Sequence, residues 1–299
     1  MLRKSNGTLF EKIEITFSGE KTPMLMPSSF DPKSIQKPHL VTIGYSHYCE
    51  LSRWALEHAG IDFEEIQYIP GYHGKFVGQL RRNKSDRSQS SYVGQESGVH
   101  GGRRKYAVPL VCLPGGRVLK DSWEVLEYAL GETDQEWKTL FDKELGVSVR
   151  QLAYHYLLAP ESKHLLNRMI SSSSVYERIL WLFINGKVIA GIQQLLAITP
   201  ENVERSKETV RRIFESVGAA VTERGGTLSS DGSFGAMDIA FCSLAAYCVM
   251  PDNFGNGAVK MPGIDDFTPS FQTFIRECRE TVAGQYIMNT YDQRRTAVI

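Results

Sequence analysis

The sequence has no excess of charge of either sign, because 34 Lys+Arg residues balance 34 Asp+Glu residues over 299 positions. Without surplus positive charge there is no electrostatic attraction to nucleic acid or to an anionic membrane surface, so we expect neither partner. A long apolar run is also lacking. The longest, from Ala236 to Met250, contains Asp238 and is shorter than the ~20 residues of a membrane-crossing helix, so we expect a buried core helix and no membrane span.

Cysteine is scarce as well. The five cysteines are Cys49, Cys112, Cys242, Cys248 and Cys278. Their odd number and irregular spacing are typical of a reduced intracellular protein without a disulfide framework. His47, His58 and His73 do not combine with them at the spacing of a metal site, so we expect no metal. The N-terminal residues also lack the apolar core of a secretion signal, which predicts a cytoplasmic location.

What is present is the composition of a globular protein, with 42% hydrophobic and 23% charged residues. At roughly 150 residues per domain, the length suggests two domains. Residues 1–38 alternate only weakly and contain Pro23, Pro27, Pro32 and Pro38. We therefore expect a loosely attached N-terminal extension that could add one edge strand.

The chain from residue 39 begins with a β-α-β unit. A short β-branched run from His39 to Gly44 predicts a strand, and apolar residues at helical spacing predict a helix over Ser46 to Gly60. The alternating stretch from Asp62 to Ile69 predicts a second strand, which stops at Pro70. This order starts a parallel sheet.

A polar insertion over residues 74–105 follows, and we expect it to be a long loop. Tyr106 to Leu113 then predicts a strand interrupted by Pro109, and Gly115-Gly116 predicts a hairpin into the strand Arg117 to Leu119. A helix over Trp123 to Ala129 follows, with Asp121 or Ser122 as its N-cap. Residues 39–132 thus have the β-α-β-β-β-α order of a thioredoxin-like domain.

Residues 133–299 show helical patterns and no strong strand, so we expect an all-helical C-terminal domain that begins near Gly131 to Asp134. The predicted helices are Gln135 to Tyr156, Val175 to Leu196, Asn202 to Arg224, Ala236 to Val249 and Ser270 to Ala283. Asp238 lies in an apolar helix start, where a carboxylate must be satisfied by the backbone N–H groups of the helix N-terminus. We interpret Asp238 as structural.

The turn before the first helix is the strongest candidate for chemistry. In the thioredoxin arrangement the catalytic position is the first of a Cys-x-x-Cys turn, and here Ser46 holds that place while Cys49 holds the second. Backbone N–H groups at a helix N-terminus favour an anion, and a serine hydroxyl that donates to a thiolate would lower the pKa of that thiol. Tyr45 offers a second hydroxyl close by, although an aromatic residue there more often serves packing. The alternatives for the other two residues are an ordinary helix cap for Ser46 and a buried inert thiol for Cys49.

Together these residues resemble the glutathione S-transferase superfamily over about residues 39 to 290. The first helix, Ser46-His-Tyr-Cys-Glu-Leu-Ser-Arg-Trp-Ala-Leu-Glu57, is similar to a subgroup with the pattern Ser-x-Tyr-Cys-x-x-x-Arg-Trp-Ala-Leu-Glu. The Val108-Pro109 step, Asp121-Ser122 at a helix start and the Phe234 to Phe241 segment follow in the order of that superfamily.

The resemblance implies a glutathione site in the first domain. Ser46 would activate the thiol, Val108 before a cis Pro109 would bind the cysteinyl backbone, and Asp121 and Ser122 would hold the γ-glutamyl group. The family usually places a basic or amide residue on the glycyl carboxylate, and the candidates here are Lys75, Arg103, Arg104 and Lys105.

The function that follows is a cytoplasmic glutathione transferase for detoxification, which activates glutathione as a thiolate for attack on a hydrophobic electrophile. The family is commonly dimeric, so a homodimer is expected. One alternative is a non-catalytic module of the same fold that binds a ligand or a protein. A further alternative is a glutathione-dependent thiol reductase that uses Cys49 as its nucleophile.

Overall fold

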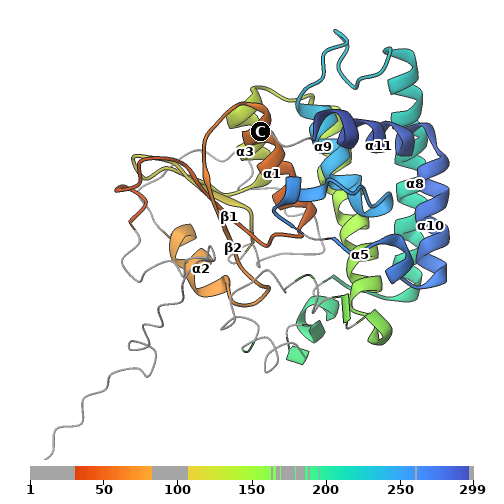
Figure 1. The fold of residues 1–299 in the computed structure, drawn as a ribbon, viewed down its shortest axis with the longest axis horizontal. Coiled ribbons are helices and arrows are strands. Elements are labelled where there is room, and N and C mark those ends of the chain that lie inside the picture. The colour runs from red at the N-terminus through yellow and green to blue at the C-terminus, as the bar shows by residue number, and fades with distance from the viewer. Residues whose placement is uncertain are drawn as a thin grey trace, which may run out of the picture.

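The structure is a computed structural model, and it describes residues 31–82, 107–162, 164–165, 169, 179, 186–187, 189–194, 196–259 and 261–295. A small sheet with its helices forms one part of the molecule, and a bundle of helices lies beside it (Figure 1). The 1–38 extension lies mostly outside the described residues, as does its expected edge strand.

The sheet has four strands in the order β2-β1-β3-β4. These are β1 (His39–Thr42), β2 (Glu64–Gln67), β3 (Leu110–Cys112) and β4 (Val118–Leu119). β2 is parallel to β1, whereas β3 pairs antiparallel with both β1 and β4. The expected strands are confirmed, although β3 begins after Pro109, which cannot donate a backbone hydrogen bond to the sheet.

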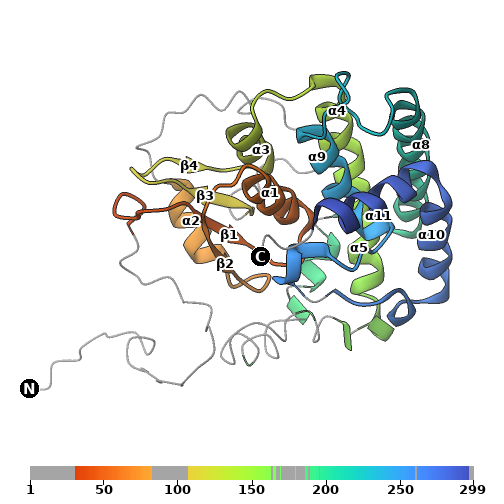
Figure 2. The same cartoon turned by 45° about the horizontal axis from the view of Figure 1, so that its top comes forward.

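Both faces of this sheet are covered, because side chains alternate along each strand. Leu40 packs with Leu56 of α1 (His47–His58) and Val125 of α3 (Ser122–Leu130) on one face. Its neighbour Val41 packs on the opposite face with Val77 of α2 (Gly74–Arg82). Figure 2 shows α1 and α3 on the side of the sheet opposite to α2.

Helix α2 corrects the expectation that residues 74–105 form a loop throughout. Its apolar residues Val77 and Leu80 are one turn apart and buried against the sheet. Two such residues in a polar stretch are too few to predict a helix, and the sheet face supplies the missing stabilisation. The element order is therefore β-α-β-α-β-β-α, and residues 83–105 lie outside the described part of the chain.

The rest of the described chain is helical. The longer helices are α4 (Gln135–Leu140), α5 (Gly146–Leu157), α8 (Pro200–Glu223), α9 (Ala236–Ala245), α10 (Pro269–Glu280) and α11 (Val282–Arg294). A π-helical turn, Phe141–Leu145, joins α4 to α5, so the expected helix Gln135 to Tyr156 is one continuous element with a local irregularity. α11 was not expected, and the predicted helix Val175 to Leu196 lies largely outside the described residues.

Helix α9 is the centre of the core, where every residue from Met237 to Ala245 is buried. Asp238 accepts hydrogen bonds from the backbone N–H of Leu228 at 2.7 Å and of Gly235 at 2.9 Å, and the Tyr286 hydroxyl donates to it as well. The structural role expected for Asp238 is confirmed. None of the helices in the described part of the chain is long and apolar enough to cross a bilayer.

A buried network of ion pairs links the two parts of the molecule. Arg53 in α1 binds Glu50 at 2.6 Å and Glu65 of β2 at 2.6 Å. Arg295, at the end of α11, binds the other oxygen of Glu50 at 2.8 Å and also pairs with Glu57. Because Glu50 and Arg53 are almost fully buried, this network holds α1 against the end of the helical part.

Candidate functional site

The register of the sheet brings the candidate residues to one edge. Val41 in β1 pairs with Leu110, so the Val108-Pro109 step before β3 lies beside the end of β1, where Ser46 follows. Val111 pairs with Leu119 of β4, so Asp121 and Ser122 after β4 lie at the same end of the sheet. Three separate segments therefore converge at the N-terminus of α1.

Ser46 is the N-cap residue of α1, and its backbone is extended at φ −75° and ψ 127°. Its side chain accepts no capping hydrogen bond from the helix, although a serine at this position usually does. The backbone N–H of Ser46 donates to the Ile43 carbonyl at 2.9 Å, which holds the turn, and the residue is partly exposed. The hydroxyl is thus not used to stabilise the helix.

Cys49 lies in the first turn of α1 and is fully buried. Burial raises the pKa of its thiol to about 12, although hydrogen bonds from Ile43 and Ser46 oppose that shift. A thiol with this pKa is almost entirely protonated at neutral pH, and the protonated form is a poor nucleophile. Tyr45 is also buried, burial raises its pKa, and its backbone carbonyl accepts a hydrogen bond from the Tyr247 hydroxyl at 2.6 Å.

The Val108–Pro109 peptide bond is cis, as the resemblance implied. Pro109 is buried and Val108 is half-buried at the edge of the sheet. The side chain of Asp121 accepts a hydrogen bond from the Trp123 N–H at 2.8 Å, so Asp121 rather than Ser122 caps α3. Ser122 is 4% exposed, next to this cap.

Helix α5 of the helical part approaches the same turn. The sequence predicted this helix but did not indicate that it lies beside Ser46. The ring Nε2 of His47 lies 3.1 Å from the Gly146 carbonyl, and because a carbonyl only accepts, this nitrogen carries the proton. Burial and the nearby charge of Arg150 lower the pKa of His47 to about 3, so the ring is neutral. The Arg150 guanidinium lies 5.5 Å from the centre of the Tyr48 ring.

The basic residues that were expected to bind the glycyl carboxylate of glutathione lie outside the described side chains. Lys75 lies in α2, but its side chain is outside the described structure, and Arg103, Arg104 and Lys105 lie outside the described residues. No cluster of three or more potential metal ligands occurs among the residues that the structure describes.

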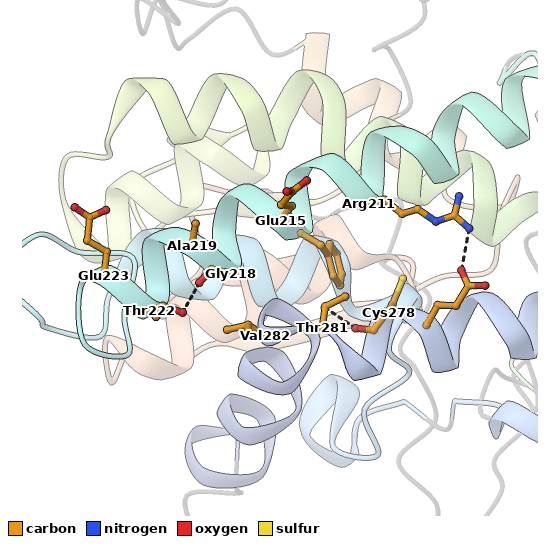
Figure 3. A pocket seen from close by; sticks show the side chains of 11 residues that line it. Arg211, Glu215, Gly218, Ala219, Thr222, Glu223, Cys278, Thr281 and Val282 are labelled. Carbon is orange, nitrogen blue, oxygen red and sulfur yellow. Dashed lines mark hydrogen bonds and ion pairs between the residues drawn. The ribbon is translucent and has the colours of Figure 1, made fainter.

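A groove of about 680 Å³ lies elsewhere, between α8 and the junction of α10 and α11 (Figure 3). Phe214 and Cys278 form its buried floor, and an ion pair of 2.8 Å between Arg211 and Glu277 closes one end. Both views of the fold place α8 and α10 on the side of the bundle away from α1 (Figures 1 and 2). The groove is therefore separate from the edge at Ser46.

Comparison with known proteins identifies the class of fold. No family model matches the sequence, and no curated protein does. A glutathione S-transferase of Ceriporiopsis subvermispora, solved in complex with glutathione, is 15% identical with a TM-score of 0.50 and covers 88% of this chain and 99% of its own. The chain thus has the glutathione S-transferase fold, a thioredoxin-like domain followed by an all-helical domain.

Two further solved structures have lower TM-scores. Glutathione transferase GSTFuA3 from Phanerochaete chrysosporium is 13% identical with a TM-score of 0.47, and the match covers 87% of this chain and 97% of that chain. The beta-etherase LigF from Sphingobium sp. strain SYK-6 is 13% identical with a TM-score of 0.45, and the match covers 85% of this chain and 99% of that chain.

Proposed function

We propose that this protein is a glutathione transferase that activates glutathione as a thiolate at Ser46 for attack on a hydrophobic electrophile. One observation carries the proposal. The Ser46 hydroxyl stands at the N-terminus of α1 without a capping bond, on the same edge as Val108-Pro109 and Asp121-Ser122. The hydroxyl does not cap the helix, and because the neighbouring Cys49 thiol is protonated and can itself donate a hydrogen bond, the Ser46 O–H is available to a ligand.

The chemistry at Ser46 follows from the charge of a thiolate. A hydrogen bond donated to the thiolate form, together with the partial positive charge at the N-terminus of α1, favours ionisation of the bound thiol. The free thiol has a pKa near 8.5, so a downward shift toward neutral pH raises the fraction of the reactive form severalfold. The sulfur then bonds to the electrophilic carbon.

The remainder of the site would hold the peptide. The backbone of Val108, which precedes cis Pro109 and β3, would exchange hydrogen bonds with the cysteinyl backbone of glutathione. Asp121 would attract the α-amino group of the γ-glutamyl residue, and Ser122 would donate to its carboxylate at the N-terminus of α3.

The reductase alternative is less well supported. It needs the thiolate of Cys49, whereas this thiol is fully buried and burial holds it in the protonated form. We further propose a cytoplasmic location, a role in detoxification and a homodimer, on the strength of the family resemblance.

Calorimetric titration with glutathione tests the proposal, followed by a conjugation assay with a small aryl halide. Saturable binding and turnover above the uncatalysed rate are expected. Binding without turnover on any electrophile would favour the non-catalytic module of the same fold, and the absence of binding at millimolar glutathione would exclude the transferase.

A further inference from the structure

Helix α5 presents two polar side chains to the first turn of α1. Arg150 and Tyr154 are four residues apart and therefore lie on one face of α5. The guanidinium of Arg150 lies 5.5 Å from the Tyr48 ring centre, two residues beyond Ser46. Its charge also acts on His47 and on Tyr154, so these groups form one cluster, which we call the α5 cluster.

Arg150 has no carboxylate partner among the described residues. No ion pair to it occurs within that part of the chain, and its buried Nε atom has no hydrogen-bond partner there. By contrast, Arg53 and Arg295 each bind two carboxylates. A buried donor without a partner is unfavourable, and in a native protein it requires an explanation.

The neighbours of Arg150 do not provide a negative charge. His47 is neutral and its Nε2–H is bonded to the Gly146 carbonyl. Tyr154 keeps its proton because burial raises its pKa despite the opposing charge of Arg150, so its hydroxyl can donate. The α5 cluster therefore holds a cation and a donor beside the turn of Ser46, without an acid.

We propose that Arg150 and Tyr154 bind a carboxylate on the electrophile, so the preferred substrates are anionic rather than purely hydrophobic. A guanidinium matches a carboxylate with two parallel N–H···O bonds, and the Tyr154 hydroxyl supplies a third donor. This inference rests on the proposed transferase function and names the substrate class of that same site.

The probes are 4-chloro-3,5-dinitrobenzoate and its methyl ester. In both, the glutathione sulfur bonds to the carbon that carries chlorine, and chloride leaves with the electron pair of the broken bond. For each probe, kcat/KM at saturating glutathione is divided by the uncatalysed rate constant. We expect the carboxylate to be preferred, and Arg150→Gln to lower its kcat/KM by about 10-fold to 100-fold, chiefly through KM, with the ester little changed.

Two further variants separate charge recognition from a structural effect. Arg150→Lys keeps the positive charge but loses the planar guanidinium that can form two parallel hydrogen bonds, so it should retain part of the preference for the carboxylate. Arg205→Gln is the matched control, since Arg205 lies exposed on α8 and pairs only with Glu201 among the described residues. This variant should leave both rates unchanged.

An equal loss on both probes in Arg150→Gln would overturn the inference in favour of an action on the thiolate, and unchanged rates would overturn it altogether. The two glutathione conjugates are also titrated by calorimetry, which needs no turnover. If glutathione binds but the carboxylate conjugate binds no tighter than the ester conjugate, this inference alone fails. If neither glutathione nor a conjugate binds, the proposed function fails with it.

Discussion

Nε of Arg295 lies 2.8 Å from Oε1 of Glu50, although the two residues are 245 positions apart. Glu50 is in α1, next to the proposed site, and Arg295 follows the last helix of the described chain. Arg53 binds the second oxygen of Glu50, so one buried carboxylate joins two guanidinium groups. The position of α1, and with it that of Ser46, depends on this contact.

Removal of Arg295 should destabilise the fold. In Arg295→Met, Glu50 loses one of its two cations while it stays buried, and the loss of one partner of a buried pair typically costs about 3 to 5 kcal/mol. The free energy of unfolding in urea measures the effect. Arg205→Met, at the exposed pair with Glu201, is the control and should change it by less than about 0.5 kcal/mol. Equal effects of the two variants would contradict the role of the network.

The same network should make stability depend on acid pH. Burial acts to raise the pKa of Glu50, but Arg295 and Arg53 outweigh it and hold that pKa below its usual value of 4.5. A carboxyl with a lowered folded-state pKa contributes stability above its unfolded pKa and loses this contribution as pH falls through the folded value. Unfolding free energies between about pH 2 and 7 should therefore fall on the acid side. Glu50→Gln should reduce the slope of unfolding free energy against pH. An unaltered slope would mean that other titrating groups cause the loss of stability in acid.

Ser46→Ala tests the chemistry. The loss of one hydrogen bond to a thiolate should raise the pKa of bound glutathione and lower conjugation at neutral pH by about 10-fold to 100-fold, since such a bond contributes about 1.5 to 3 kcal/mol. Higher pH should restore part of the rate. Since the hydroxyl does not cap α1, the fold should be preserved, which a thermal unfolding curve checks.

Cys49→Ser tests the reductase alternative. Both variants are assayed with a mixed disulfide, and a loss of activity in Cys49→Ser but not in Ser46→Ala would support the reductase.

Ser122→Ala tests the peptide site. The lost hydrogen bond should weaken glutathione binding by about 1 to 3 kcal/mol, measured by calorimetry, because Ser122 begins α3 at the proposed γ-glutamyl position. Asp121 still caps the helix through the Trp123 N–H, so helix α3 should remain folded. An unchanged affinity would mean that this assignment is wrong.

Gly284→Ala should destabilise the packing of α11 against the end of α10. A Cβ added at Gly284 would lie 1.9 Å from the backbone oxygen of Cys278, and a backbone atom cannot move aside as a side chain can. Overpacking of this kind typically costs about 1 to 3 kcal/mol, read as a lower midpoint of thermal unfolding. Gly191→Ala is the control, since nothing lies within 4 Å of a Cβ there. A stable Gly284→Ala variant would show that α10 and α11 are less closely packed.

The sequence predicted the elements whose patterns are local and strong. The strand from His39, the helix from Ser46 and the buried helix from Ala236 all show their apolar periodicity within a few turns. Helix α11 escaped prediction because its buried face mixes small, polar and large residues, among them Gly284, Thr290 and Tyr291, so no apolar stripe marks it. Its burial comes from α8, α9 and α10, which pack against it.

The candidate site divides in the same way. The sequence predicted Ser46, Val108-Pro109 and Asp121-Ser122 as site residues because each stands at a predicted turn of a recognisable order of elements. The α5 cluster was not found, because Arg150 and Tyr48 are far apart in the chain and each has an ordinary sequence context. Only the approach of α5 to α1 brings them together, and Gly146 permits it, since a Cβ there would lie within 2.4 Å of the Tyr48 hydroxyl oxygen.

By itself, the sequence determined the order of the strands, most of the helices (α2 and α11 excepted) and the serine at the start of α1, since hydrophobic period, turn residues and capping act over a few neighbours. The tertiary structure decided which residues meet. The register of β1, β3 and β4 brings three loops to one edge of the sheet. Tertiary packing also pairs Arg295 with Glu50, and it places no acidic side chain beside Arg150 among the described residues. These contacts depend on long-range packing, in which a side chain's partner is fixed by the positions of whole elements and not by its neighbours in the chain.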